Sequence, residues 1–228
     1  MGAAAGERAP ASRAAPGGIA LLCAVNAERR WLARVCRGGA EPLAGGIGAA
    51  AAGRAAERLL ADPPEALLSV GFCGALDPRL RVGDLVAAEC VVEEASGEVF
   101  AADPRLLAAA PGRRGTLVTA RHLVRTPADR ARLDGLACDL ESAAAARVAA
   151  GAGIPFLALR AVSDETRHIL PDFDRLTDAA GRLRPWAALR HVVIRPWELA
   201  RLLRLWPASR RAGRALAAGV DDLLARLG

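Results

Sequence analysis

The chain has 228 residues, of which 53% are hydrophobic and 25% are charged, and its formal net charge is +6. This composition is typical of a folded globular domain and excludes an intrinsically disordered chain. All 31 cationic side chains are arginine, but no basic stripe is interleaved with stacking aromatics, so nucleic-acid binding is not indicated. The five cysteines show no C-x-x-C spacing and the three histidines are far apart. We therefore expect neither a disulfide framework nor a metal site.

The first 17 residues are rich in alanine, glycine, proline and arginine. They lack the apolar core of a signal peptide, so we interpret residues 1–17 as a disordered leader and residues 18–228 as one domain. No segment is long and apolar enough to span a bilayer. We therefore expect a cytoplasmic protein.

Short apolar runs alternate with helical patterns along the rest of the chain. Apolar runs bounded by glycine and proline predict strands over residues 18–25, 67–71, 85–92, 115–120 and 154–162. Helical patterns follow residue 26 and the glycine turn of segment 44–60, and cover residues 103–110, 142–151, 197–206 and 210–227. This alternation predicts an α/β fold.

Residues 138–165 are the stretch around which we organise the site. Glu141 stands where a short extended segment gives way to an alanine-rich helix, and Asp164 stands at the carboxyl end of the following buried strand. In open α/β sheets, ligands bind outside the carboxyl ends of strands, so the two carboxylates could form one site. The pattern alone leaves an alternative open, in which Glu141 is a first-turn helix acid and Asp164 is a helix cap.

The run D-L-E-S-A-A, followed after a helix by P-F-L-A-L-R-A-V-S-D, resembles the signature of the nucleoside phosphorylase-I family. That family includes purine nucleoside phosphorylases and methylthioadenosine/S-adenosylhomocysteine nucleosidases. The resemblance implies a single three-layer domain with a central twisted mixed β-sheet flanked by helices. It also implies that Glu141 holds the ribose, that Leu140 replaces the family's Met beneath the sugar, and that Asp164 protonates the purine. Arg160 would place the nucleophile or orient Asp164, and Ser163 would contribute to substrate binding.

Glu28 follows the first predicted strand. In the nucleosidases this strand ends in a short acidic run whose last Glu activates the attacking water, and the resemblance places Glu28 on that residue. A first-turn helix acid is the structural alternative. The segment 44–60 is similar to the family's S-G-I-G turn, which we interpret as mainly structural.

The run G-F-C-G-A-L-D-P-R-L-R-V-G-D, which begins at Gly71, resembles the family's glycine-rich G-S-x-G-x-L…V-G-D segment. Gly71 would let the backbone approach a sugar or an anion closely. Phe72 stands where the family commonly has a Ser that binds phosphate or helps to hold water, and Ser69 stands where some phosphorylases have a phosphate-binding Arg. Both departures weaken the case for a standard phosphate pocket. Leu123 and Val124 are expected to wall the purine.

Residues 182–228 form a basic extension that we expect to be helical. Within residues 197–206, apolar side chains recur at helical spacing and two arginines fall on another face. Such a helix can lie in a membrane interface, and packing on the domain or on a partner subunit is the alternative. The R-P-W-E-L-A-R-L-L-R run resembles the hopanoid-associated phosphorylase branch of the family. That resemblance implies adenosylhopane as the substrate, and an adenosyl lipid would account for peripheral contact with the inner membrane surface.

The implied reaction is cleavage of the N-glycosidic bond of a purine nucleoside with release of adenine. Hydrolysis and phosphorolysis both stay open, with no cofactor and with inorganic phosphate as a co-substrate only in the second case. A soluble methylthioadenosine/S-adenosylhomocysteine nucleosidase is the first alternative, and a non-catalytic nucleoside-binding protein is the second. The family also implies a homo-oligomer.

Overall fold

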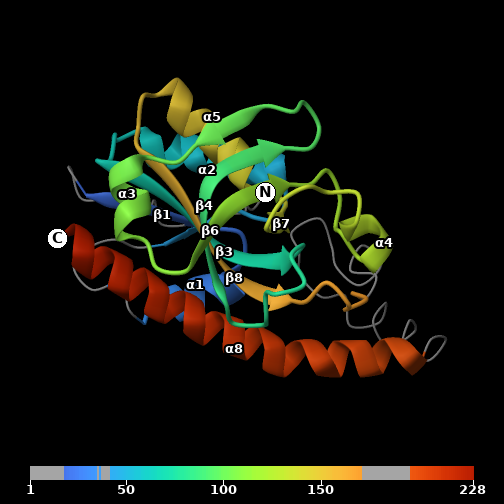
Figure 1. Ribbon diagram of the computed structural model, residues 1–228. Helices are drawn as coiled ribbons and strands as arrows, with labels where there is room; N and C mark the ends of the chain where they lie inside the picture. The colour runs from blue at the N-terminus through green and yellow to red at the C-terminus, as the bar shows by residue number, and fades with distance from the viewer. Residues whose placement is uncertain (1–17, 35, 37–41, 171–195) are drawn as a thin grey trace, which may run out of the picture.

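A mixed β-sheet runs through the centre of the computed structural model, with helices on both of its faces (Figure 1). The structure describes residues 18–34, 36, 42–170 and 196–228, with backbone only for residues 196–205. The predicted leader and the first part of the basic extension, residues 182–195, lie outside the described residues. The three-layer α/β architecture that the sequence predicted is confirmed.

Eight strands of the described chain belong to the sheet: β1 (Ile19–Cys23), β2 (Leu43–Ala44), β3 (Ala66–Ala75), β4 (Leu85–Glu93), β5 (Val99–Ala101), β6 (Arg113–Thr119), β7 (Ala137–Asp139) and β8 (Phe156–Asp164). Their order is β2-β1-β3-β7-β6-β4-β5, and β8 pairs with both β3 and β4. The strands β3, β8, β4, β6 and β7 therefore pair in a closed circuit. The carboxyl ends of β3 and β8 lie together because these strands are parallel, and the short strand β7 runs antiparallel beside the end of β3.

The helices form two layers. The described helices are α1 (Asn26–Leu32), α2 (Ala49–Leu60), α3 (Pro104–Ala109), α4 (Pro127–Arg130), α5 (Ser142–Gly151) and α8 (Pro196–Leu227). Figure 1 shows α2 and α5 on one face of the sheet and α1 and α8 on the other. β8 serves both layers because its side chains alternate: Ala158 and Val162 pack in the core under α2 and α5, whereas Leu157 and Leu159 pack in the core under α8.

The predicted end of the strand over residues 67–71 is wrong. The prediction ended it at residue 71 because of the glycines, but β3 continues to Ala75. Pairing with β8 on one side and with β7 on the other supplies hydrogen bonds that outweigh the weak strand propensity of Gly71 and Gly74. β8 likewise begins at Phe156 and includes Asp164. The strand β5 and the helix α4 had no predicted counterpart.

The predicted C-terminal pair of helices is one helix. α8 runs from Pro196 to Leu227 with Pro207 inside it. A proline in a helix interior removes one hydrogen bond and usually kinks or breaks the helix, so packing of the following turns must offset that cost. Leu216, Val220 and Leu223 are fully buried against the sheet and supply this packing. No helix in the described residues is long and apolar enough to cross a membrane.

Two helical glycines test how closely α8 is docked. A Cβ at Gly213 of α8 would overlap the indole ring of Trp31, whereas a Cβ at Gly151 of α5 would have no atom within 4 Å. We expect Gly151→Ala to raise the free energy of unfolding by up to about 1 kcal/mol, because alanine favours helix. We expect Gly213→Ala to lower it by about 1–3 kcal/mol through overpacking. Urea denaturation of both variants measures the difference, and equal shifts would contradict this docking of α8 on α1.

Candidate active site

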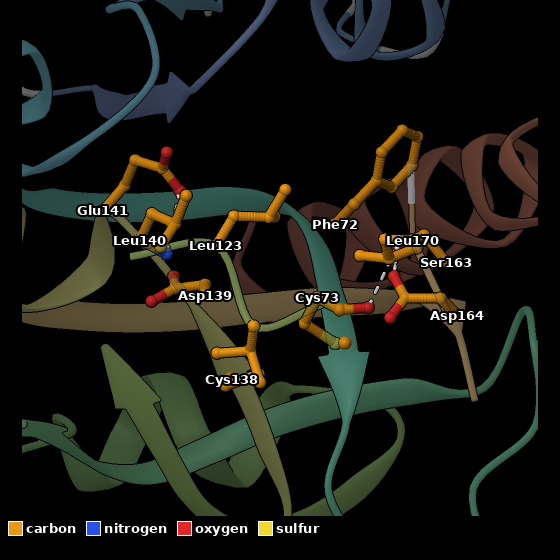
Figure 2. A pocket seen from close by; sticks show the side chains of 12 residues that line it. Phe72, Cys73, Leu123, Cys138, Asp139, Leu140, Glu141, Ser163, Asp164 and Leu170 are labelled. Carbon is orange, nitrogen blue, oxygen red and sulfur yellow. Dashed lines mark hydrogen bonds between the residues drawn. The ribbon is translucent and has the colours of Figure 1, made fainter. Parts of the chain in front are cut away.

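A pocket of about 140 Å³ lies where residues of β3, β7 and β8 come together. Figure 2 shows Glu141 and Leu140 on one side of it, Asp164, Ser163 and Leu170 on the other, and Leu123 between them. It is lined by Phe72, Cys73, Gly74, Leu123, Val124, Cys138, Asp139, Leu140, Glu141, Ser163, Asp164 and Leu170. Most of the predicted site residues therefore lie together, whereas Glu28, Gly71 and Arg160 are not part of the lining.

Asp164 ends β8 at the floor of the pocket and is 5% exposed. Its Oδ1 accepts a hydrogen bond of 2.7 Å from Ser163 Oγ, and its Oδ2 accepts one of 2.6 Å from Arg130 Nη2. Of the two roles predicted for Arg160, the orientation of Asp164 is wrong, because the cation hydrogen-bonded to Asp164 is Arg130, and the placing of the nucleophile stays a prediction. No local pattern indicates this partner, which lies 34 residues earlier in the chain.

Arg160 points instead to Asp139, the last residue of β7. Its Nη2 donates to Asp139 Oδ2 at 2.8 Å, and the same atom lies 2.8 Å from Ser69 Oγ and 2.7 Å from Ser142 Oγ. Asp139 Oδ1 accepts a further bond of 2.8 Å from Thr119. A charge buried in a strand is tolerated only when it is paired and hydrogen-bonded, and this network explains the arginine inside an apolar run.

Glu141 occupies the N-cap position of α5, but its side chain does not cap that helix. Its Oε1 accepts a bond of 2.8 Å from the N–H of Gly48, so the segment 44–60 helps to hold this acid. Gly48 has a φ of +90°, in the left-handed region that suits glycine. Burial, together with repulsion from Asp139, raises the pKa of Glu141 to about 7.

Glu28 contacts the backbone of β3 and is 4% exposed. Its Oε1 accepts a bond of 2.8 Å from the N–H of Phe72, and its Oε2 accepts bonds of 2.9 and 3.0 Å from the N–H groups of Ala24 and Val25. A Cβ at Gly71 would lie 2.8 Å from Oε1, so glycine at this position lets the carboxylate approach β3. Burial raises the pKa of Glu28, against the lowering effect of its N–H donors.

Of the three acids to which the family resemblance gives roles, Glu28, Glu141 and Asp164, two line the pocket. Glu141 and Asp164 line the pocket, whereas Glu28 does not line it and instead accepts a hydrogen bond from the N–H of Phe72, a lining residue. Glu28 still belongs to the same electrostatic cluster, because its charge contributes to the raised pKa of Glu141. The catalytic and binding roles assigned to these residues stay predictions.

Five lining residues were not among the predicted site residues: Cys73, Gly74, Cys138, Asp139 and Leu170. Cys73 and Cys138 come from β3 and β7 and face the pocket (Figure 2). Burial raises the pKa of the Cys138 thiol to about 12, so this thiol is neutral near pH 7. Among the described residues, no group of three His, Cys, Asp or Glu side chains could hold a metal ion.

A family model described as the phosphorylase superfamily matches residues 32–184, which is more than half of the chain. The chain belongs to the phosphorylase superfamily. The resemblance that the D-L-E-S-A-A and R-A-V-S-D runs carry is thereby confirmed. A search of curated proteins found no match to this superfamily member.

Solved structures share the fold of this phosphorylase-superfamily chain. The futalosine hydrolase of Helicobacter pylori has 14% sequence identity and a TM-score of 0.69, over 92% of this chain and 98% of that one. The S-adenosylhomocysteine nucleosidase of Streptococcus pyogenes, in complex with 5-methylthiotubericidin, has 19% identity and a TM-score of 0.70, over 92% and 97%. The methylthioadenosine/S-adenosylhomocysteine nucleosidase of Colwellia psychrerythraea, in complex with adenine, has 17% identity and a TM-score of 0.70, over 94% and 97%.

The pKa of Glu141 predicts a pH-dependent stability. Because the pKa is raised from 4.5 to about 7, the folded protein keeps this proton to a higher pH than the unfolded chain does. Protonated Glu141 therefore adds up to about 3 kcal/mol to the free energy of unfolding. This stabilisation is fully present below pH 4.5 and is lost as the pH rises towards 7. We expect Glu141→Gln to lose less free energy of unfolding than the wild type between pH 5 and pH 8.

Urea denaturation at several pH values within that range measures the effect. The same change at Glu89, which is exposed on β4, is the control and should leave the wild-type slope intact. An unchanged slope in the Glu141→Gln variant would contradict the assignment.

Proposed function

We propose that the protein cleaves the N-glycosidic bond of an adenosyl nucleoside and releases adenine. The observation that carries this proposal is the placement of Asp164 and Glu141 on opposite sides of one pocket, with the apolar side chains of Leu123 and Val124 in its wall. The β7–α5–β8 unit delivers both acids. An apolar wall between two carboxylates suits a flat base at one end and a polyhydroxylated sugar at the other.

Asp164 is the proposed general acid at the base end. A purine leaves poorly as an anion, so the imidazole nitrogen must receive a proton while the bond to the anomeric carbon breaks. The proton moves from the Asp164 carboxyl to that nitrogen, and the bonding electron pair leaves with the base. Such a positioned acid contributes roughly a hundred- to ten-thousand-fold in rate.

Glu141 is the proposed ribose ligand at the sugar end. Its carboxylate would accept hydrogen bonds from the ribose hydroxyls, and Leu140 would pack under the sugar ring. As the base departs, the sugar develops oxocarbenium character, which a nearby carboxylate stabilises. Ionised Glu141 is also the better acceptor, so its deprotonation favours substrate binding.

Glu28 is the proposed base for the nucleophile. A carboxylate has about four acceptor positions, and three backbone N–H groups occupy three of them, so one is left for a water molecule. This arrangement favours water over phosphate as the nucleophile, because Phe72 offers no hydroxyl group to an anion. Ser69 offers none either, since its hydroxyl is buried against Arg160. Water would add to the anomeric carbon and pass one proton to Glu28.

The proposed substrate is adenosylhopane, with methylthioadenosine or S-adenosylhomocysteine as the alternative. Phe72 and Leu170 give the pocket an apolar side, and Phe72 also packs against the core beneath α8. On α8, Trp206 is 72% exposed and is followed along the helix by the exposed Arg210 and Arg211, which suits contact with an anionic lipid surface. The solved nucleosidases support the alternative, because they are named for methylthioadenosine and S-adenosylhomocysteine. A homo-oligomer is the family expectation for either substrate.

Adenine release tests the proposal. We expect the wild type to release adenine from adenosylhopane faster than from methylthioadenosine, and without added phosphate. We expect Asp164→Asn to lower kcat by roughly a hundred- to ten-thousand-fold, because it removes the proton donor. Chromatography of released adenine, with and without phosphate, measures both effects. Asp134→Asn, an exposed position, is the matched control.

Each result has a distinct meaning. Full activity in Asp164→Asn removes the acid role. Equal rates on the two nucleosides remove the lipid assignment, and a strict need for phosphate makes the reaction a phosphorolysis.

Membrane contact through α8 is a separate prediction. We expect the protein to float with vesicles of phosphatidylglycerol and phosphatidylcholine, and Trp206→Ser to reduce the bound fraction several-fold by removing an exposed aromatic anchor. Val99→Ser is the control, because Val99 is also exposed but lies on β5. Absence of flotation would leave packing as the only role of this helix.

A further inference from the structure

We propose that Arg130 is a positioning residue that locks Asp164 to the base-side wall of the pocket. This inference rests on the proposed function, because it gives Asp164 a defined orientation towards the departing base. Arg130 does not line the pocket. It acts through Asp164 and through the loop that carries Leu123 and Val124.

The Arg130–Asp164 pair is short and almost fully buried. Arg130 Nη2 lies 2.6 Å from Asp164 Oδ2, and the two side chains are 2% and 7% exposed. Nη1 donates to the carbonyl oxygen of Ala75 at 3.1 Å. A Cβ at Gly74 would lie 2.8 Å from Nη1 and 3.0 Å from Asp164 Oδ2, so glycine at position 74 makes the room that the pair needs.

The segment T-P-A-D-R, residues 126–130, fixes the backbone position of Arg130 by local hydrogen bonds. Asp129 N–H donates to Thr126 Oγ1 at 3.2 Å, and Asp129 Oδ2 accepts from Thr126 N–H at 3.1 Å, which forms a capping box. Pro127 occupies the first turn, where its missing N–H costs nothing. The short helix α4 is therefore held locally, and its last residue, Arg130, reaches under the pocket.

The same loop carries the wall of the pocket. Leu123 and Val124 precede α4 and line the pocket, and the carbonyl oxygen of Arg125 accepts a bond of 3.0 Å from the N–H of Leu170. Arg130 thus ties one end of residues 123–130 to the carboxyl end of β8. The acid and the base-side wall move as one body, so a base that packs on the wall meets Asp164 in a fixed position.

The hydrogen bonds of the pair favour a positioning role over a purely stabilising one. Among the described residues, Arg130 Nε is buried and has no hydrogen-bond partner, so the guanidinium is not placed for the largest number of bonds. Its two other nitrogens instead fix one oxygen of Asp164 and the backbone of β3. Ser163 fixes the other oxygen of Asp164 at 2.7 Å, so the carboxyl group cannot rotate without breaking a hydrogen bond to Arg130 or to Ser163.

Kinetics of Arg130→Ala and Arg130→Lys, with Arg132→Ala as the exposed control, test the inference. With methylthioadenosine and adenosylhopane as the substrates, we expect Arg130→Ala to lower kcat about a hundredfold, since misplacing a catalytic group by about 1 Å has an effect of that size. Arg130→Lys keeps the charge but cannot contact Asp164 and the Ala75 carbonyl oxygen through two fixed nitrogens, so we expect an intermediate kcat. Millimolar methylguanidinium should raise the kcat of Arg130→Ala at least tenfold and leave the kcat of the wild type unchanged.

The outcomes separate this inference from the proposed function. A wild type that releases no adenine under any condition overturns the proposed function. An active wild type whose Arg130→Ala variant keeps the kcat of Arg132→Ala overturns only the positioning role, even if its melting temperature is lower. If Arg130→Ala does not fold, Arg130→Lys decides: wild-type kcat and an unchanged pH profile of kcat/KM in that variant overturn the inference.

Discussion

The buried pair of Arg160 with Asp139 is the interaction on which the rest of the structure depends. It joins β8 to β7, and the hydroxyl groups that complete it come from Ser69 on β3 and Ser142 on α5. Removing one partner would strand a charge in the core, which costs several kcal/mol. Because Leu140 and Glu141 follow Asp139 directly, the pair also fixes where α5 begins. The sugar side of the candidate site is thus set by the closure of the barrel-like circuit.

Glycine serves this site by making room inside a strand, not by making a turn. At Gly71 a side chain would collide with the carboxylate of Glu28, and at Gly74 it would crowd the Arg130–Asp164 pair. The two glycines are three residues apart on β3, and each lets an acid from a different element approach the same backbone. The run G-F-C-G therefore carries information about the site even though its conformation is extended.

The sequence indicated the framework and the positions of the acids, but not their partners. Short apolar runs predicted most strands, and the family signature gave Glu141 and Asp164 roles in one site. The sequence could not show that Arg160 pairs with Asp139 and that Arg130 pairs with Asp164. Ion pairing depends on the closed circuit of strands and not on local pattern. The predicted end of β3 and the predicted division of α8 were wrong for a related reason. In both places tertiary contacts outweigh local propensity.

The charges beneath the sugar side do not balance. Asp139, Glu141 and Glu28 interact with a single buried cation, Arg160, and the surplus of acid contributes to the raised pKa of Glu141. A site with excess negative charge and little water stabilises positive charge more than a neutral ligand. In the proposed reaction the sugar is neutral in the substrate and cationic in the transition state. The same imbalance that weakens the folded protein above pH 7 would therefore favour the transition state over the bound nucleoside.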